Sequence, residues 1–347
     1  MRLNRRESLR WCVAGLAYRI GNSDTIRAQS VSPSNALYSA PARRSVELGL
    51  GFLKSRQNED GSFGTGGYAR NVAVCGLCGM AFLAEGSTPQ RGKFGATIGR
   101  CLDFILSSAD DSGLINVPEN TDRGPMYGHG FATLFLSEAY GTAPDRPIRE
   151  KLVGAVRLIV NTQNGEGGWR YEARRDEADI SVTVCQVMAL RAAKNAGLFV
   201  PPETIDRAVE YIKRCQNPDG GFNYMHLPTR ESRFPRSAAA VVALFSAGLY
   251  DSPEAKQGLA YLKLQTMPAK PQGEQSYFFY GNYYAAQVMW HVGGEDWTAW
   301  YGNMRDRLVA RQKQDGSWED QIGSEFATAI ACLILQMPHN YLPIFQR

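Results

Sequence analysis

The stretch Gln163-Asn-Gly-Glu166-Gly167-Gly-Trp169 decides the fold of this chain, because the same phrase recurs along the sequence. A Gln, two residues, an acid, Gly, Gly or Ser, and an aromatic follow one another again at 57–63, 216–222 and 312–318. The third copy begins 53 residues after the second, and the first begins 106 residues before the second, twice that distance. A fixed period predicts a repeat architecture before any single residue is interpreted.

Two weaker copies complete the series. Ser108-Ala-Asp-Asp-Ser-Gly113 lies between the first two clear copies, and Gln265 alone marks a copy between the last two. The spacing therefore predicts six repeat units.

Each unit contains two helical patterns of different character. Before the Gln, apolar residues recur at helical spacing with charged residues between them, which is typical of a helix with one wet face. After the aromatic, runs such as 181–190 and 326–335 are apolar nearly all round, which is typical of a buried helix. Strand patterns are missing. Six alternations predict an all-α fold, an (α/α)6 toroid with an outer and an inner ring of helices. The amphipathic pattern of the outer helices is clearest before Gln216, where the apolar positions are Ile205, Ala208, Val209 and Ile212.

The phrase itself has a predicted structural role. Asp-Gly forms a tight turn after the outer helix, because Gly accepts a positive φ. The Gln amide can reach free carbonyls at a helix end, and the aromatic can cover that amide. On this interpretation Asp60, Asp219 and Asp315 are turn residues and not catalytic acids.

Composition limits the partners. The chain has 347 residues, a net charge of +4 and no basic run interleaved with aromatics, so a nucleic-acid partner is not expected. No apolar stretch reaches the roughly 20 residues that span a bilayer, although peripheral membrane contact stays open. Seven cysteines form no even framework, and Cys75 and Cys78 have no second ligand pair. We therefore expect buried thiols, and neither a metal nor a cofactor.

The N-terminal segment differs from the rest. Residues 1–28 resemble a bacterial twin-arginine export signal, with Arg5 and Arg6 followed by Leu9 and a modest apolar stretch. A Ser-, Pro- and Ala-rich linker is predicted for 29–43 and the toroid for 44–347. This pattern favours a periplasmic or otherwise exported protein; the alternative is a cytoplasmic protein with a disordered tail.

The recurring phrases resemble the QW repeats of squalene-hopene cyclases and, more loosely, the repeats of protein prenyltransferase β-subunits. The resemblance covers residues from about 44 to the end. It implies a terpenoid cyclase-like toroid that binds an isoprenoid or similar apolar ligand in a central cavity. The prenyltransferase zinc ligands Asp, Cys and His have no recognisable counterpart here, which disfavours protein prenylation.

The cyclase resemblance breaks at the catalytic motif. Squalene-hopene cyclases protonate an alkene with the middle Asp of Asp-x-Asp-Asp-Thr. The matching stretch here is Asp179-Ile-Ser181-Val182-Thr183, so a serine stands where the resemblance implies the acid. A serine hydroxyl cannot protonate an isolated alkene, and the usual cyclase chemistry is therefore predicted to be altered or absent.

Aligning the six inner helices gives a column in which every residue is polar. Equivalent positions in a toroid lie at one height, so this column should encircle one mouth of the cavity, near helix N-termini that favour anions. Capping of those helices is the alternative explanation and stays open. The column reads Asn71, His129, Asp179, Arg233, Tyr280 and Ser324; four residues later stand Cys75, Thr133, Thr183, Ser237, Tyr284 and Thr328.

As a site, the column would be divided into two roles. Asp179 and His129 would form an acid–base pair assisted by Tyr280. Asn71 and Arg233 would bind a carboxylate, phosphate or hydroxyl group, with Arg236 and Tyr283 as replacements if the alignment slips. Aromatic rings can stabilise carbocations or stack on sugars, or they can simply pack the core. The aromatic candidates for ligand binding are Tyr283, Tyr284 and Trp169.

Three functions compete. An isoprenoid-binding toroid needs a deep apolar cavity below the polar ring. A carbohydrate-active toroid, lyase-like or hydrolase-like, needs an open, shallow and wet cleft, and the column has suitable residue types. A central hole filled by side chains would favour a non-catalytic binding module.

Overall fold

A computed structural model describes residues 37–118, 124–266 and 277–346, and the named elements in these residues are all helical. Twelve α-helices in this described part of the chain alternate between an outer and an inner ring, which confirms the all-α (α/α)6 toroid. The outer helices are α2 (Ala40–Ser55), α4 (Gly95–Ser107), α6 (Ile148–Thr162), α8 (Pro202–Arg214), α10 (Pro253–Thr266) and α12 (Gly294–Arg311). The inner helices are α3 (Val72–Leu83), α5 (Met126–Ala139), α7 (Ile180–Asn195), α9 (Phe234–Ser246), α11 (Phe278–Val292) and α13 (Ser324–Gln336).

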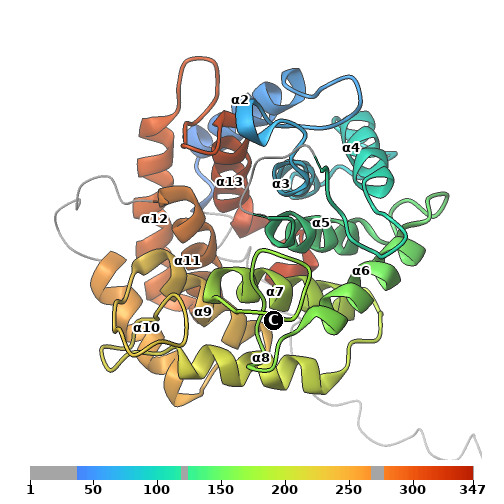
Figure 1. Ribbon diagram of the computed structural model, residues 1–347. Coiled ribbons are helices and arrows are strands. Elements are labelled where there is room, and N and C mark those ends of the chain that lie inside the picture. The colour runs from blue at the N-terminus through green and yellow to red at the C-terminus, as the bar shows by residue number, and fades with distance from the viewer. Residues whose placement is uncertain (1–36, 119–123, 267–276, 347) are drawn as a thin grey trace, which may run out of the picture. The chain divides into compact units, whose positions relative to one another are not determined.

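Both rings close on themselves. Each inner helix contacts the next one along the chain, and α13 returns to α3, while α12 packs against α2 in the outer ring (Figure 1). The inner helices are buried on nearly every face; in α3 all residues but Ala73 are buried. Their uniform apolar character therefore predicts their place in the middle of the fold.

The first helix begins earlier than the sequence indicates. α2 starts at Ala40, four residues before the predicted boundary of the toroid. Pro41 lies in its first turn, where a missing N–H costs nothing, and the Ser39 hydroxyl oxygen accepts from the Ala42 N–H at 3.4 Å. A Ser–Ala–Pro stretch that is typical of a linker is here a helix start. The predicted export signal, and the predicted linker up to residue 36, lie outside the described residues.

The Gln of each clear phrase links two units. The Gln163 amide nitrogen donates to Gly167 O in its own turn at 2.8 Å and to Thr204 O in the first turn of the next outer helix at 2.9 Å. The amide thus reaches a carbonyl at a helix end, and that helix belongs to the next unit. Gln57 and Gln216 bond in the same way to the starts of α4 and α10. Gln312 bonds to Ser45 O of α2 at 2.8 Å and thereby closes the ring.

The glycine of the phrase has no substitute. Gly167 has a φ of +98°, and a Cβ built on it would lie 2.2 Å from Arg207 O of the next outer helix. Gly113 of the weak second copy shows the same pair of features, with a φ of +92° and Gly154 O at 2.4 Å. The predicted second unit is thus a true repeat. The acids are turn residues as expected; Asp315 Oδ1, for example, accepts from the Ser317 N–H at 3.0 Å.

The aromatic residue of the phrase is fixed from two sides. The Trp169 indole N–H donates to Ile159 O at 2.8 Å, and its backbone N–H donates to the Thr183 hydroxyl at 3.1 Å. Phe63, Phe222 and Trp318 donate their backbone N–H in the same way to Cys75, Ser237 and Thr328. The residues that stand four positions after the polar column therefore accept a hydrogen bond from the phrase aromatic in four of the six units. These bonds attach the phrase to the inner ring.

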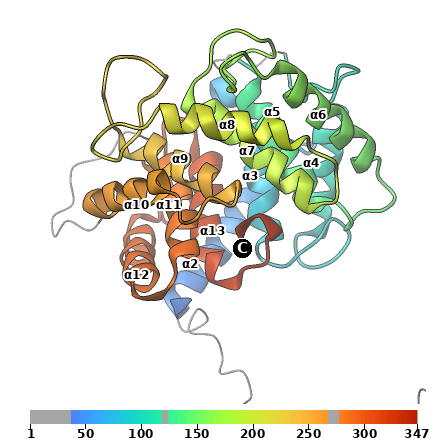
Figure 2. The ribbon, with the colours of Figure 1, turned by 90° about the horizontal axis from the view of Figure 1, so that it is seen from below.

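The middle of the toroid is filled by side chains. α5 and α11 lie opposite each other in the inner ring, yet the rings of Phe131 and Tyr283 approach to 6.2 Å between centroids. At the far mouth, the short helix η3 (Pro343–Phe345) contacts α7, and the Trp290 indole N–H donates to Phe345 O at 3.0 Å. This dark red segment lies among the inner helices in Figure 2. Within the described residues, side chains thus meet across the axis of the ring at α5 and α11, and the end of the ring at the N-termini of the inner helices is called the mouth below.

Candidate functional site

The mouth is centred on the carboxyl of Asp179. The sequence places an Asp at the N-cap of α7, where Asp179 Oδ1 accepts from the Val182 N–H at 2.9 Å. The residue is fully buried. Burial raises the pKa of Asp179 to about 6, although the bonds from Val182 and Tyr224 and the charge of Arg170 oppose the rise. Near neutral pH this carboxyl can therefore release or take up a proton.

Two tyrosines and an arginine surround that carboxyl from outside the inner ring. The Tyr224 hydroxyl donates to Asp179 Oδ2 at 3.2 Å and is itself bonded to the Tyr171 hydroxyl. Arg170 Nε lies 4.0 Å from the same oxygen, and its guanidinium lies over the ring of Tyr171. These groups form a polar rim, defined as Arg170, Tyr171, Asp179 and Tyr224.

Below the rim lies an aromatic floor, defined as Phe131, Tyr280, Tyr283 and Tyr284. The Tyr284 ring lies 5.0 Å from the rings of both other tyrosines, and its hydroxyl contacts Cys185 Sγ of α7 at 3.4 Å. No described group accepts a hydrogen bond from the hydroxyls of Tyr280 and Tyr283. The floor thus combines ring faces with unused donors.

Ser181 stands between rim and floor. It is 7% exposed and occupies the position of the acid in the cyclase motif. Tyr127 of α5 lies beside it, and the Ser181 hydroxyl offsets part of the rise that burial causes in the pKa of Tyr127. The nearest carboxyl along the chain is that of Asp179 two residues earlier, while the exposed carboxylate of Glu177 pairs with Arg170 of the rim.

The predicted partner of Asp179 has a different role. His129 Nδ1 accepts from the Ile115 N–H at 3.1 Å, which leaves Nε2 protonated and facing Ala155 O at 3.3 Å. Burial lowers the pKa of His129 to about 4, so the ring is neutral. Ile115 is the counterpart of the phrase aromatic in the weak second unit. His129 therefore accepts the backbone hydrogen bond that a hydroxyl such as that of Thr183 accepts in other units. Both of its ring nitrogens face backbone groups and not Asp179.

Two further candidates make structural contacts. Asn71 is the N-cap of α3 and accepts from the Ala73 and Val74 N–H groups at 2.9 and 3.2 Å. Trp169 is 1% exposed and bonded as described above. For Asn71 the capping explanation that competes with a site thus has direct geometric support, whereas Ser324 is the first residue of α13 and its hydroxyl faces Glu325 at 3.4 Å.

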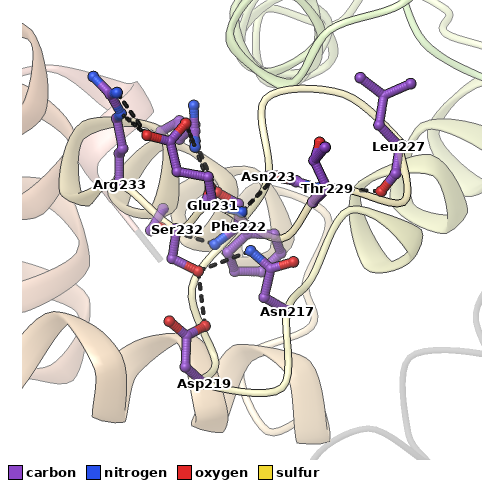
Figure 3. A network of polar contacts seen from close by, with 11 residues as sticks. Asn217, Asp219, Phe222, Asn223, Leu227, Thr229, Glu231, Ser232 and Arg233 are labelled. Carbon is purple, nitrogen blue, oxygen red and sulfur yellow. Dashed lines mark hydrogen bonds and ion pairs between the residues drawn. The ribbon is translucent and has the colours of Figure 1, made fainter.

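The two candidate arginines are held by one carboxylate. Arg233 is the N-cap of α9, is exposed, and bonds Glu231 at 2.6 Å (Figure 3). Arg236 donates to Phe222 O at 2.9 Å and approaches Glu231 at 3.2 Å. A ligand anion would have to compete with Glu231 for both guanidinium groups.

Sequence reasoning missed the rim tyrosines, although a signal was present. Tyr171 and Tyr224 both follow the phrase aromatic by two residues and are 53 residues apart. It also missed Glu138 at the far end of α5, which is 8% exposed and accepts from the Ile344 N–H at 3.3 Å. Burial raises the pKa of Glu138 to about 8. Within the described residues, no three His, Cys, Asp or Glu side chains converge as metal ligands would.

Comparison with known proteins agrees with this geometry. The squalene-hopene cyclase C-terminal domain family matches residues 134–292. Drimenyl diphosphate synthase of Streptomyces showdoensis is 26% identical over 182 residues, which are 52% of this chain and 32% of that protein. The match thus spans about a third of the length of this relative. The chain is a squalene-cyclase-like toroid.

Solved structures share the fold at low identity. The type II terpene cyclase MstE from Scytonema is 16% identical over 87% of this chain and 99% of its own, with a TM-score of 0.56. A GH76 α-mannanase of Bacteroides thetaiotaomicron is 10% identical, with 86% and 96% covered and a TM-score of 0.63. The cellobiose 2-epimerase of Spirochaeta thermophila is 11% identical, with 90% and 99% covered and a TM-score of 0.66. None of the helices in the described residues is long and apolar enough to cross a bilayer.

Proposed function

We propose that this protein binds an isoprenoid at the mouth of the toroid, with the chain of the ligand against the aromatic floor and the buried carboxyl of Asp179 beside it. The family match and the fold support an isoprenoid-cyclase-like function. The observation that carries the proposal is the place of Asp179, a buried carboxyl with a pKa of about 6 beside a cluster of tyrosine rings. Type II terpene cyclase MstE has been solved with geranylgeranyl dihydroxybenzoate, which is an isoprenoid substrate.

The chemistry of the mouth differs from that of a squalene cyclase. Protonation of an isolated alkene needs a strong acid, and a carboxyl whose pKa is raised to about 6 is a weak one. Ser181 supplies no acid at all. The protein would therefore bind its ligand as the family does, while any proton step would run through Asp179 and be confined to groups easier to protonate than an alkene.

Ligand entry requires a change at the floor. The rings of Tyr280, Tyr283 and Tyr284 occupy the space that a deep pocket would need. The hydroxyls of Tyr280 and Tyr283 make no well-formed hydrogen bond, although Ser181 and Gln287 lie beside them, so rotating these rings breaks only weak polar contacts. We expect the isoprenoid to displace Tyr280 first, since it lies nearest the mouth along α11 and is only half-buried.

Binding of farnesol, an uncharged isoprenoid, to the full chain tests the proposal. Calorimetry or tyrosine fluorescence should show saturable binding at pH 5.5 that weakens at least tenfold in Tyr280→Ala. Tyr341→Ala is the matched control, because Tyr341 is 58% exposed and lies just before η3 at the far mouth. Equal affinity in both variants, or no saturation, would contradict the proposed site.

The carbohydrate-active alternative is favoured by one observation. The GH76 α-mannanase and the cellobiose 2-epimerase share the fold at TM-scores of 0.63 and 0.66. Release of sugars from α-1,6-mannan or from uronic-acid glycans, lost in Asp179→Asn, would support this alternative. Farnesol binding without such activity would dismiss it.

A further inference from the structure

A second candidate site lies on the outside of the ring. A cleft of about 780 Å³ opens between the end of α8, the start of α10 and the loop that follows Asn223. This is the size range of small-molecule sites. None of its lining residues belongs to the polar rim or the aromatic floor, so it is separate from the mouth.

The walls of the cleft are fixed in place (Figure 3). The side chain of Asn223 is buried; its amide nitrogen donates to Leu227 O at 3.3 Å and to Thr229 O, and its oxygen accepts from the Glu231 N–H at 3.0 Å. On the opposite side, Gln216 holds the start of α10 through Glu254 O at 2.8 Å. An irregular loop that one buried amide braces at three points costs little to order when a ligand binds.

The cleft carries an excess of positive charge. Lys213, Arg214 and Arg230 line it together with the carboxylate of Glu254, and Lys213 is paired with Glu210 at 3.2 Å, so the excess of positive charge is +1 and rests on the two arginines. Arg214 donates a hydrogen bond to the backbone oxygen of Glu166 at 2.6 Å. This carbonyl is neutral and does not offset the positive charge of the guanidinium group. Arg230 extends from the exposed part of the loop. Guanidinium groups suit carboxylates and phosphates, so one part of the ligand is expected to be anionic.

Glu254 indicates a second property of the ligand. Glu254 lines the cleft, its Oε2 is buried, and no described residue donates a hydrogen bond to that oxygen. A buried carboxylate oxygen without a donor is costly. Rotation of the Glu254 side chain toward the cleft would let a ligand hydroxyl satisfy this oxygen, whereas a bare anion would be repelled by it. The exposed amide of Gln257 offers both a donor and an acceptor nearby.

We propose that this cleft binds a monosaccharide that bears an anionic group. The basic side chains hold the carboxylate or phosphate, and Glu254 accepts a sugar hydroxyl. The site is independent of isoprenoid binding at the mouth, and its substrate class differs.

Calorimetry on the full chain at 0.15 M salt tests this inference with four probes: glucose 6-phosphate, glucuronate, glucose and inorganic phosphate. We expect saturable binding of at least one anionic sugar, at least tenfold tighter than glucose or phosphate alone. Arg230→Ala should weaken it about tenfold. Lys256→Ala is the matched control, because Lys256 is an exposed cation of α10 that does not line the cleft.

Glu254→Gln separates recognition of the sugar from simple attraction of an anion. The variant removes a negative charge, so phosphate alone should bind better, while the preference for the sugar over phosphate should fall toward one. Three results would overturn the inference: no saturable binding of either anionic sugar, binding that Arg230→Ala leaves unchanged, or a preference that survives Glu254→Gln. Farnesol binding should be the same in Arg230→Ala as in the wild type, so failure of one site does not imply failure of the other.

Discussion

Phe131 and Tyr283 meet across the axis of the toroid, with ring centroids 6.2 Å apart and ring planes at 57°. They belong to α5 and α11, which face each other from opposite sides of the inner ring. A contact between opposite helices means that side chains fill the middle of the fold. The functional surface is therefore confined to the mouth above this pair and to the outside of the ring.

This contact should be measurable as a coupling energy. A double-mutant cycle with Phe131→Ala and Tyr283→Ala is expected to give about 0.5–1.5 kcal/mol of coupling, because aromatic pairs contribute that much beyond burial. Urea unfolding of the four proteins provides the values. Additive effects within about 0.3 kcal/mol would mean that the rings do not touch.

Removal of the Tyr283 hydroxyl alone should change the free energy of unfolding in the opposite direction from removal of the ring, and it serves as a control. No described group pairs with it. Tyr283→Phe should therefore leave the free energy of unfolding unchanged or raise it, since a buried polar group without a partner is removed.

The hydrogen bonds of the Gln side chains in the phrase should contribute strongly to stability. Gln163→Ala removes two buried hydrogen bonds and leaves Gly167 O and Thr204 O without that donor. We expect a loss of about 1–3 kcal/mol in the free energy of unfolding. Gln90→Ala is the matched control, since its exposed amide bonds only the Asp145 carboxylate, and it should stay within about 0.5 kcal/mol of wild type. Equal effects of the two changes would contradict the claim that the Gln163 hydrogen bonds stabilise the fold.

Glu138 should make the fold less stable as the pH rises. Its pKa is raised from 4.5 to about 8 in the folded state, chiefly by burial. The folded protein thus holds this proton more tightly than the unfolded chain, and the stabilisation present below pH 4.5 is lost as the pH rises toward 8. Glu138→Gln keeps an acceptor for the Ile344 N–H without the charge. The free energy of unfolding should therefore fall less between pH 5 and 8 in the variant than in the wild type, and parallel curves would refute the assignment.

The thiols should be inert in the folded protein. Six cysteines lie in the described residues, and all are buried. Burial raises the pKa of Cys75, Cys185 and Cys215 to about 12, so almost no thiolate exists at pH 8. In a Cys12→Ser background, a thiol reagent should label none of the six before urea is added and all of them afterwards. Rapid labelling without urea would show that the core is open.

The fold could be predicted from the sequence because its decisive interactions are local. Gly167 follows the acid in a tight turn. The glycine itself predicts a positive φ, and the periodic spacing of the phrase can be read directly from the sequence. The sequence did not identify the acceptor of the Gln163 amide, since Thr204 comes from the next unit and is known only once the ring is closed. Pro41 was taken for a linker residue because the sequence alone does not separate a helix start from a turn.

The candidate site was predicted only in part. The polar column correctly pointed to the N-terminal ends of the inner helices, but polarity alone cannot separate a cap such as Asn71 from an ionisable group such as Asp179. His129 entered the column as an acid–base candidate, whereas its ring takes over the fastening contact of the degenerate second unit. Glu138 was missed because only the folded-back C-terminal segment buries it.

The pH dependence of farnesol binding tests the central claim most directly. An uncharged chain next to Asp179 favours the neutral carboxyl, because ionisation would place a charge against an apolar ligand. The affinity should therefore be highest below pH 6 and fall by up to about tenfold per pH unit above it, while Asp179→Asn should keep the low-pH affinity at every pH. Affinity that is independent of pH in the wild type, or a pH dependence that persists in Asp179→Asn, would contradict the claim that the ligand lies at this carboxyl.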